Sequence, residues 1–157
     1  MTMPLRHLVW EESLPAEVDQ MLQVAIAGVA PTSLRDILAV AVPGGKRIRP
    51  VLTAMPCPAA GGDERDTITA GAAVELLHVS SLVHDDIMDN AETRRGKPTV
   101  VHQHGTPVAI LAGDALVALS FRMIQSIHHP RKDEIQRVLT TAFLNLCEGQ
   151  CADVCNN

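Results

Sequence analysis

Aromatic side chains are almost absent from this sequence. Its 157 residues include no tyrosine, and aromatic residues amount to 2% although hydrophobic residues make up 46%. A core must therefore be built from Ala, Leu, Val, Ile and Met, which suit helix packing better than sheets. Positive charge is also in short supply, because the net charge is −5. This balance argues against a nucleic-acid partner.

Long apolar segments are missing as well. No stretch reaches the roughly eighteen apolar residues of a membrane span. The first ten residues contain Pro4, Arg6 and His7, and no long apolar run follows them, so no signal peptide is visible. With only four cysteines in addition, we expect a cytoplasmic protein in a reducing compartment that does not span a membrane.

Helical periodicity recurs along the chain, so the expected fold is all-α, in a single domain over residues 1–157. About six helices are expected, with no linker long enough to divide them. They cover residues 11–30, 33–42, a short piece from Pro50 that two prolines end, 66–89, 107–127 and 131–153. The expected N-caps are Ser33, either Asp66 or Thr67, and Thr106.

The stretch at residues 76–89 organises the chain, because an apolar helical run there ends in three carboxylates. Asp85 and Asp89 lie one helical turn apart on one face, with Asp86 to the side. Hard cations such as Mg²⁺ bind carboxylates together with water and phosphate oxygens. The other interpretation is a solvated acidic helix end, although carboxylates at a helix C-terminus oppose its dipole by roughly 0.3–1 kcal/mol each. A calcium hand is excluded, since its sixth loop position is Asn90 where glycine is required.

Basic residues form two short clusters. Gly44 and Gly45 precede an expected helix start, where backbone N–H groups and the helix dipole favour an anion. Taken alone, a solvated glycine turn explains this segment at least as well. The clusters hold six of the thirteen Lys and Arg residues: Lys46, Arg47, Arg49, Arg94, Arg95 and Lys97.

Three segments in order resemble a known family, the trans-isoprenyl diphosphate synthases or polyprenyl synthetases. GGKRIRP at residues 44–50, DDIMD at 85–89 and RRGKPT at 94–99 are similar to the GGKxxRP, DDxxD and RRGxPT motifs of that family. Gly113-Asp114 and residues 149–153 also resemble its later helices. A DDxxD motif alone would fit terpene cyclases equally well, and the basic motifs on both sides favour the chain-elongating synthases.

The resemblance implies a transferase of isoprenoid biosynthesis, built as the N-terminal half of the helical isoprenoid-synthase bundle. In such a prenyltransferase an allylic diphosphate ionises and isopentenyl diphosphate attacks the cation, which lengthens the product by five carbons. The family is also typically dimeric, so a homo-oligomer or a partner chain is expected. The resemblance assigns Mg²⁺ to Asp85 and Asp89, catalytic support to Asp86 and Arg94, contact with the allylic diphosphate to Arg94, and isopentenyl diphosphate to Lys46, Arg49, His78 and Arg95.

The other candidate ligands in the sequence are histidines and cysteines. His78 alone would be an ordinary core residue, but its place near the Asp85 stripe and the resemblance favour a hydrogen bond to diphosphate, not metal ligation. His102, His104, His128 and His129 show no metal-site pattern and are expected on the surface or in loops. A small apolar packing stripe is favoured over a metal site for the three cysteines that share one helix face, Cys147, Cys151 and Cys155.

Product length is implied by the residues just before the first aspartate. In the family these positions line the pocket for the growing chain, and an aromatic residue there forms its floor. Here the positions are Ser80 and Ser81, with Leu77 deeper. No aromatic blocks the pocket at this level, so a product of twenty carbons or longer is expected.

The sequence departs from the family in two respects. Relatives are longer and carry a second aspartate-rich motif, which these 157 residues do not contain, and residues 55–58 interrupt a helix with two prolines. Three explanations stay open: a fragment, a chain that works with another polypeptide, or a chain that has lost catalysis. The alternative to an enzyme is a non-catalytic subunit or diphosphate-binding module that partners a full-length synthase.

Overall fold

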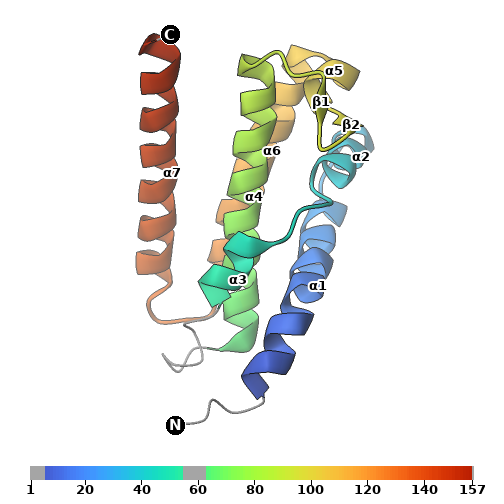
Figure 1. Cartoon of the computed structure of the whole chain (residues 1–157). Helices are drawn as coiled ribbons and strands as arrows, with labels where there is room; N and C mark the ends of the chain where they lie inside the picture. The colour runs from blue at the N-terminus through green and yellow to red at the C-terminus, as the bar shows by residue number, and fades with distance from the viewer. Residues whose placement is uncertain (1–5, 55–62, 157) are drawn as a thin grey trace.

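The described part of the chain is almost wholly helical (Figure 1). The structure is a computed structural model that describes residues 6–54 and 63–156. Its seven helices confirm the all-α expectation. They are α1 (Arg6–Ala27), α2 (Thr32–Ala41), α3 (Ile48–Ala54), α4 (Glu64–Met88), α5 (Val100–His104), α6 (Thr106–Gln125) and α7 (Lys132–Asn156), with a hairpin of β1 (Thr93–Arg94) and β2 (Lys97–Pro98) after α4.

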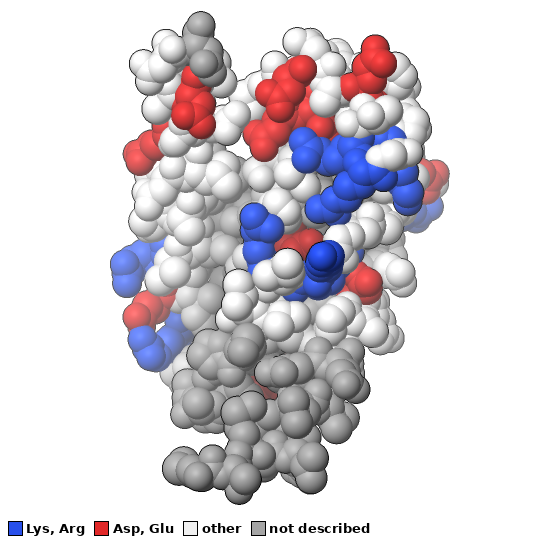
Figure 2. Space-filling view, in the orientation of Figure 1, with Lys and Arg blue, Asp and Glu red and all other residues white. Residues whose placement is uncertain are grey.

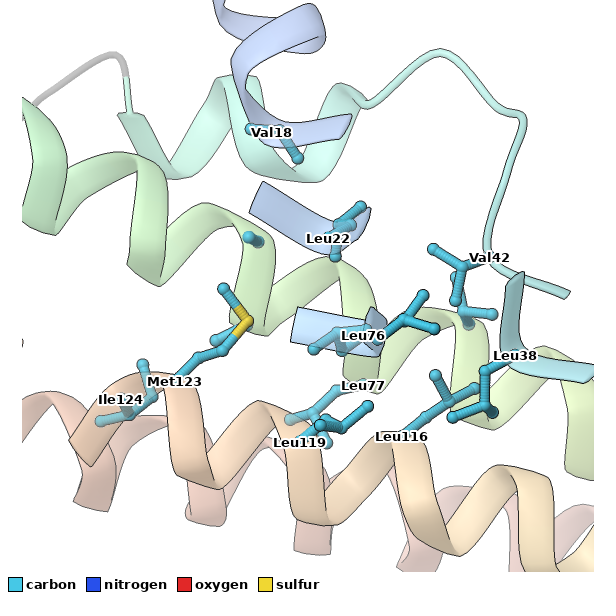
Figure 3. Packing of buried hydrophobic residues seen from close by; sticks show 14 of the residues in the cluster. Val18, Leu22, Leu38, Val42, Leu76, Leu77, Leu116, Leu119, Met123 and Ile124 are labelled. Carbon is cyan, nitrogen blue, oxygen red and sulfur yellow. The ribbon is translucent and has the colours of Figure 1, made fainter. Parts of the chain in front are cut away.

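Helix α4 is the central element, and α1, α3 and α6 pack against it. Small residues allow the close approach. A Cβ atom on Gly71 would lie only 3.2 Å from the Cα atom of Pro50, and the Ser120 hydroxyl donates a 2.8 Å hydrogen bond to the Ala73 carbonyl. Leucine and other aliphatic side chains fill the remaining space (Figure 3), among them Val18, Leu22, Leu38, Leu76, Leu116, Leu119 and Ile124.

Helices α6 and α7 differ in how they are packed. Helix α6 is long and apolar enough to cross a membrane by composition alone, with a mean hydropathy of 1.7, yet it supplies core residues as an inner helix of a bundle does. Helix α7 stands beside the bundle in Figure 1 and contributes one buried residue, Leu139. It exposes four large apolar side chains, those of Val138, Leu144, Leu146 and Val154.

Several expected boundaries and caps were wrong. Asp63 caps α4 by accepting a hydrogen bond from the Asp66 amide, so the cap lies three residues earlier than expected. Neither Ser33 nor Thr106 caps a helix, because α2 and α6 begin one residue earlier, after Pro31 and Gly105. The hairpin and α5 were not anticipated, and α1 begins before residue 11. The proline interruption at 55–58 lies outside the described residues.

A single buried guanidinium joins the first four helices. Arg47, 4% exposed, precedes α3 and donates to Asp19 of α1 and to Glu75 of α4, each at 2.7 Å. A third hydrogen bond, 3.1 Å long, goes to the carbonyl of Val42 at the end of α2. The sequence placed Arg47 in a basic cluster without a role of its own, and this geometry makes it a structural cation. Planar guanidinium forks suit such multiple pairing.

Removing the cation should therefore unfold the bundle more easily. We expect Arg47→Met to lower the free energy of unfolding by about 3–5 kcal/mol, because Glu75 is left buried and unpaired. Arg47→Met combined with Glu75→Met should cost less than Arg47→Met alone. Urea denaturation followed by circular dichroism measures both. Arg49→Met, at an exposed position two residues away, serves as the control and should change stability by no more than about 0.5 kcal/mol. Equal losses at positions 47 and 49 would contradict the role given to Arg47.

Candidate functional site

Two of the three predicted carboxylates lie together at the end of α4. Asp89 is exposed and forms the C-cap, where its N–H donates a 2.8 Å hydrogen bond to the Asp85 carbonyl. Burial raises the pKa of the Asp85 carboxyl, the neighbouring charge of Asp89 raises it further, and Arg94 opposes both. A carboxyl whose pKa is raised by burial and by a second carboxyl is stabilised in its charged form by a bound cation.

Asp86 has a different task from its neighbours. It is 5% exposed, and its carboxylate accepts a 2.8 Å hydrogen bond from Nε of Arg94. This carboxylate holds Arg94 and is turned away from solvent, and the catalytic support expected of Asp86 stays a prediction. Arg94 keeps 36% of its side chain exposed, so it remains close to the acidic pair while fixed at one end.

The hairpin brings the two basic motifs together. Its strands pair Thr93 with Pro98 and Arg94 with Lys97, and Arg95 and Gly96 form the turn with φ values of 52° and 74°. This tight turn directs Arg95 towards the loop before α3. A Cβ atom on Gly45 would lie only 2.8 Å from Nη1 of Arg95. Glycine at 45 therefore leaves room for the guanidinium.

Lysine and arginine side chains gather on this side of the molecule, below a group of acidic side chains (Figure 2). Lys46, Arg49 and Arg95 are all exposed. His78 is half-buried, and its pKa is lowered by burial first and by Arg49 second, with further lowering from Arg95 and Arg94. A neutral imidazole among cations can donate a hydrogen bond to an anion without adding another charge.

An apolar groove of about 890 Å³ opens between α4 and α7. Arg49, His78 and Asp85 line its polar part, and Leu77 and Phe143 are among the apolar residues along it. A site with this lining suits a molecule with an anionic head and a hydrocarbon tail.

The two serines before the acidic motif lie on different sides of α4. Ser81 lines the groove together with Leu77, and its hydroxyl donates a 2.8 Å hydrogen bond to the His78 carbonyl. Ser80 is fully buried outside the groove, and its hydroxyl has no hydrogen-bond partner. Successive helical residues are about 100° apart, and the rotation of α4 turns Ser81 and Leu82 towards the groove while Ser80 faces the packed interior. In this structure Ser81 borders the groove and Ser80 does not, and the product pocket itself stays a prediction.

His84 was missed by the sequence reasoning. Its Nε2 atom lies 3.4 Å from the carbonyl of Ile110 and 3.6 Å from a carboxylate oxygen of Asp114. A Cβ atom on Gly113 would overlap the ring, at 2.1 Å from Nε2. This contact holds the acidic end of α4 against α6. The sequence signal for this contact is Gly113-Asp114, which resembles the family. The sequence does not show that His84 of α4 packs against it.

The remaining candidates fall outside the groove's polar part. His102, His104, His128 and His129 are exposed, as expected of surface residues, although His129 borders the far part of the groove. The packing stripe expected at Cys147, Cys151 and Cys155 was wrong, since all three are exposed and free. Across residues 6–54 and 63–156, no three His, Cys, Asp or Glu side chains converge on one ion position.

The donors at the end of α4 fit Mg²⁺ nonetheless. Asp85 and Asp89 offer only oxygen, which hard cations require. Mg²⁺ usually takes one or two carboxylates and completes its shell with water and substrate phosphate. Asp85 and Asp89 lie beside an exposed basic surface and meet that requirement. The bound ligand supplies the phosphate oxygens.

Comparison with known proteins gives a consistent family. The polyprenyl synthetase model matches residues 31–157. The chain is 47% identical over 112 residues to a short chain isoprenyl diphosphate synthase of Methanocaldococcus jannaschii, covering 71% of this chain and 34% of the relative. It is 37% identical over 156 residues to geranylgeranyl pyrophosphate synthase 12, chloroplastic, of Arabidopsis thaliana, covering 88% and 41%.

Solved structures agree with the sequence relatives. A geranylgeranyl pyrophosphate synthetase from Pyrococcus horikoshii superposes with a TM-score of 0.86 at 37% identity, covering 95% of this chain and 46% of that one. The chain therefore spans less than half the length of each of these relatives. With the motifs, the helical arrangement and these matches in agreement, the chain belongs to the polyprenyl synthetase family.

Proposed function

We propose that the chain supplies the diphosphate-binding half of a Mg²⁺-dependent prenyltransferase that joins isopentenyl diphosphate to an allylic diphosphate. The observation that supports this most is one of placement. Arg49, His78 and Asp85 line one groove together with a larger number of apolar side chains, so polar groups for the diphosphates and apolar space for the hydrocarbon occur together. The names of the relatives support the same reaction class.

Each residue contributes through its own contacts. Asp85 and Asp89 hold the cation, which when bound neutralises the diphosphate of the allylic substrate. Arg94, which Asp86 anchors, stabilises the negative charge that develops on the departing diphosphate. Lys46, Arg49, Arg95 and neutral His78 bind the diphosphate of the second substrate. The backbone that carries Lys46 and Arg49 is positioned beforehand, because Arg47 between them is bonded to α1, α2 and α4.

A second candidate is a non-catalytic diphosphate-binding subunit of a longer synthase. The open groove along α7 is the observation that favours it. Incubation of the purified chain with labelled isopentenyl diphosphate, an allylic diphosphate and Mg²⁺ separates the two. Product formed by the chain alone establishes the enzyme. Diphosphate binding without product, and product only after a full-length synthase is added, establishes the subunit.

The proposal also covers the length of the product, the location of the protein and its association with a second chain. Leu77 and Ser81 admit a long hydrocarbon without an aromatic side chain in the first turn below Asp85, so products of twenty carbons or more are expected of the complete enzyme. Free Cys147, Cys151 and Cys155 accord with a reducing, cytoplasmic location. Association with a second copy or a partner chain accords with the apolar surface of α7.

Diphosphate binding should depend on Mg²⁺ through the acidic pair. We expect Mg²⁺ to strengthen pyrophosphate binding at least tenfold, and Asp85→Asn with Asp89→Asn to abolish that gain. The reason is that two carboxylates bind Mg²⁺ well only when phosphate oxygens complete the shell. Isothermal titration calorimetry with and without Mg²⁺ gives the affinities. Asp36→Asn, an exposed change on α2, should behave as the unchanged protein. A Mg²⁺ effect that survives in the double variant would exclude this site.

The ionisation of His78 should report on the anion. In the free chain the pKa of His78 lies below its ordinary value, and the neutral ring contributes stability above pH 6.5 that is lost as the pH falls through the lowered pKa. Bound pyrophosphate should raise the pKa, because it neutralises Arg49 and Arg95. Proton NMR titration, assigned with His78→Gln, follows the ring directly. A pKa that does not respond to saturating pyrophosphate would place the anion elsewhere.

The two adjacent serines provide a matched pair for the groove. Ser80→Phe should destabilise the chain by about 1–3 kcal/mol or more, because the ring must enter a packed interior. Ser81→Phe should change the free energy of unfolding by no more than about 0.5 kcal/mol, since it points into open space. In a complete enzyme, Ser81→Phe should shorten the product. Urea denaturation and product chromatography test the two parts. Equal destabilisation by both changes would mean that Ser81 does not face the groove.

A further inference from the structure

Gly113 lies buried in the interior of α6, although glycine is among the least favourable residues inside a helix. Its position against α4 gives the reason. A Cβ atom on Gly113 would overlap the imidazole of His84, because its three nearest neighbours are all atoms of that ring. The missing side chain therefore leaves a niche that the ring of His84 fills, and a methyl group at this position would force the ring out.

The polar end of the same ring also faces α6. Nε2 of His84 lies 3.4 Å from the carbonyl oxygen of Ile110 and 3.6 Å from a carboxylate oxygen of Asp114. In the tautomer that carries its proton on Nε2, the ring donates towards the carbonyl. At these lengths both polar contacts are weak. The fit of the ring on Gly113 consequently determines its position more than the polar contacts do.

Two contacts define how α4 lies on α6. The Ser120 hydroxyl is bonded to the Ala73 carbonyl, and His84 contacts α6 about three turns further along α4. One contact alone would let α4 rotate about its own axis, whereas two separated contacts fix both its rotation and its register. The second contact lies at the acidic end, because His84 immediately precedes Asp85.

The ring of His84 is free to move in one direction only. Its other side borders a recess of about 310 Å³ between α4 and α7, which Asp85 borders as well. A ring expelled from the niche would therefore enter this recess beside Asp85. The packing on Gly113 keeps the space next to that carboxylate clear.

We propose that His84 is a positioning residue of the prenyl-transfer site. Seated on Gly113, it sets the orientation in which Asp85 and Asp89 present their carboxylates to Mg²⁺ and a diphosphate. The inference rests on the function proposed above, since it concerns the same acidic pair. Mg²⁺ demands a nearly octahedral shell, and a displacement of about 1 Å in a site can cost about a hundredfold in rate.

Calorimetric titration of the whole chain with pyrophosphate, with and without Mg²⁺, separates the acidic pair from the basic groups. We expect the gain in affinity due to Mg²⁺ to fall below about threefold in Gly113→Ala and in His84→Ala, while the affinity without Mg²⁺ changes by less than about twofold. His84→Gln should keep most of the gain, because glutamine can fill the niche and place a donor near the position of Nε2. Gly149→Ala adds its methyl group to open space on α7, so this matched control should behave as the unchanged chain.

A double variant distinguishes positioning from a general effect of alanine in α6. Once the ring is removed, the methyl group has nothing to displace, so Gly113→Ala combined with His84→Ala should be no worse than His84→Ala alone. Losses that add in the double variant, or a full Mg²⁺ gain in a folded Gly113→Ala, would overturn the inference. If urea denaturation shows that Gly113→Ala does not fold, equal gains in His84→Ala and His84→Gln would overturn it instead. Absence of any Mg²⁺ gain in the unchanged chain would remove the proposed function itself.

Discussion

The ion pair between Arg47 and Glu75 is the constraint on which the arrangement of this molecule depends. One guanidinium, nearly excluded from solvent, contacts α1, α4 and the end of α2 while it sits at the start of α3. A charge in this position is tolerable only while its partners stay in place. Arg47 therefore anchors the backbone on either side of it, and the exposed side chains of Lys46, in the preceding loop, and Arg49, in the first turn of α3, project from beside this anchor.

The electrostatics of the site follow from the same frame. Acidic side chains end α4 and basic side chains occupy the loops beside it, and Asp86 ties the two together through Arg94. Burial and Asp89 raise the pKa of Asp85, whereas burial and Arg49 lower that of His78. Each group is thus held away from its ordinary ionisation first by burial and then by a neighbour of its own sign. A metal ion beside Asp85 and a diphosphate beside His78 would offset the second of these causes.

The sequence was informative where the pattern was local and strong. The acidic end of α4, its helical periodicity and the two basic motifs could be placed without coordinates, because spacing along a helix determines which residues share a face. Ser80 and Ser81 show where this fails, since the choice between them depends on the rotation of α4 against α6. Arg47 shows a second limit. Arginine is ordinarily exposed, and only the approach of Asp19 and Glu75 reveals that this one is buried. The turn at Arg95 could not be predicted, because Arg95 has a left-handed backbone conformation that residues other than glycine seldom adopt.

Helix α7 forms the side of the groove that is packed least tightly. It has one buried residue, Leu139, whereas α4 has buried residues along nearly its whole length. Segments with so few buried contacts open locally at a small fraction of the free energy needed to unfold the whole domain. Amide hydrogens of residues 132–156 should therefore exchange with solvent long before those of α4. Helices α4 and α7, the two sides of the groove, consequently belong to different cooperative units. Helix α4 holds the charged groups in place, and the distance of α7 from them can adapt to the width of a bound molecule.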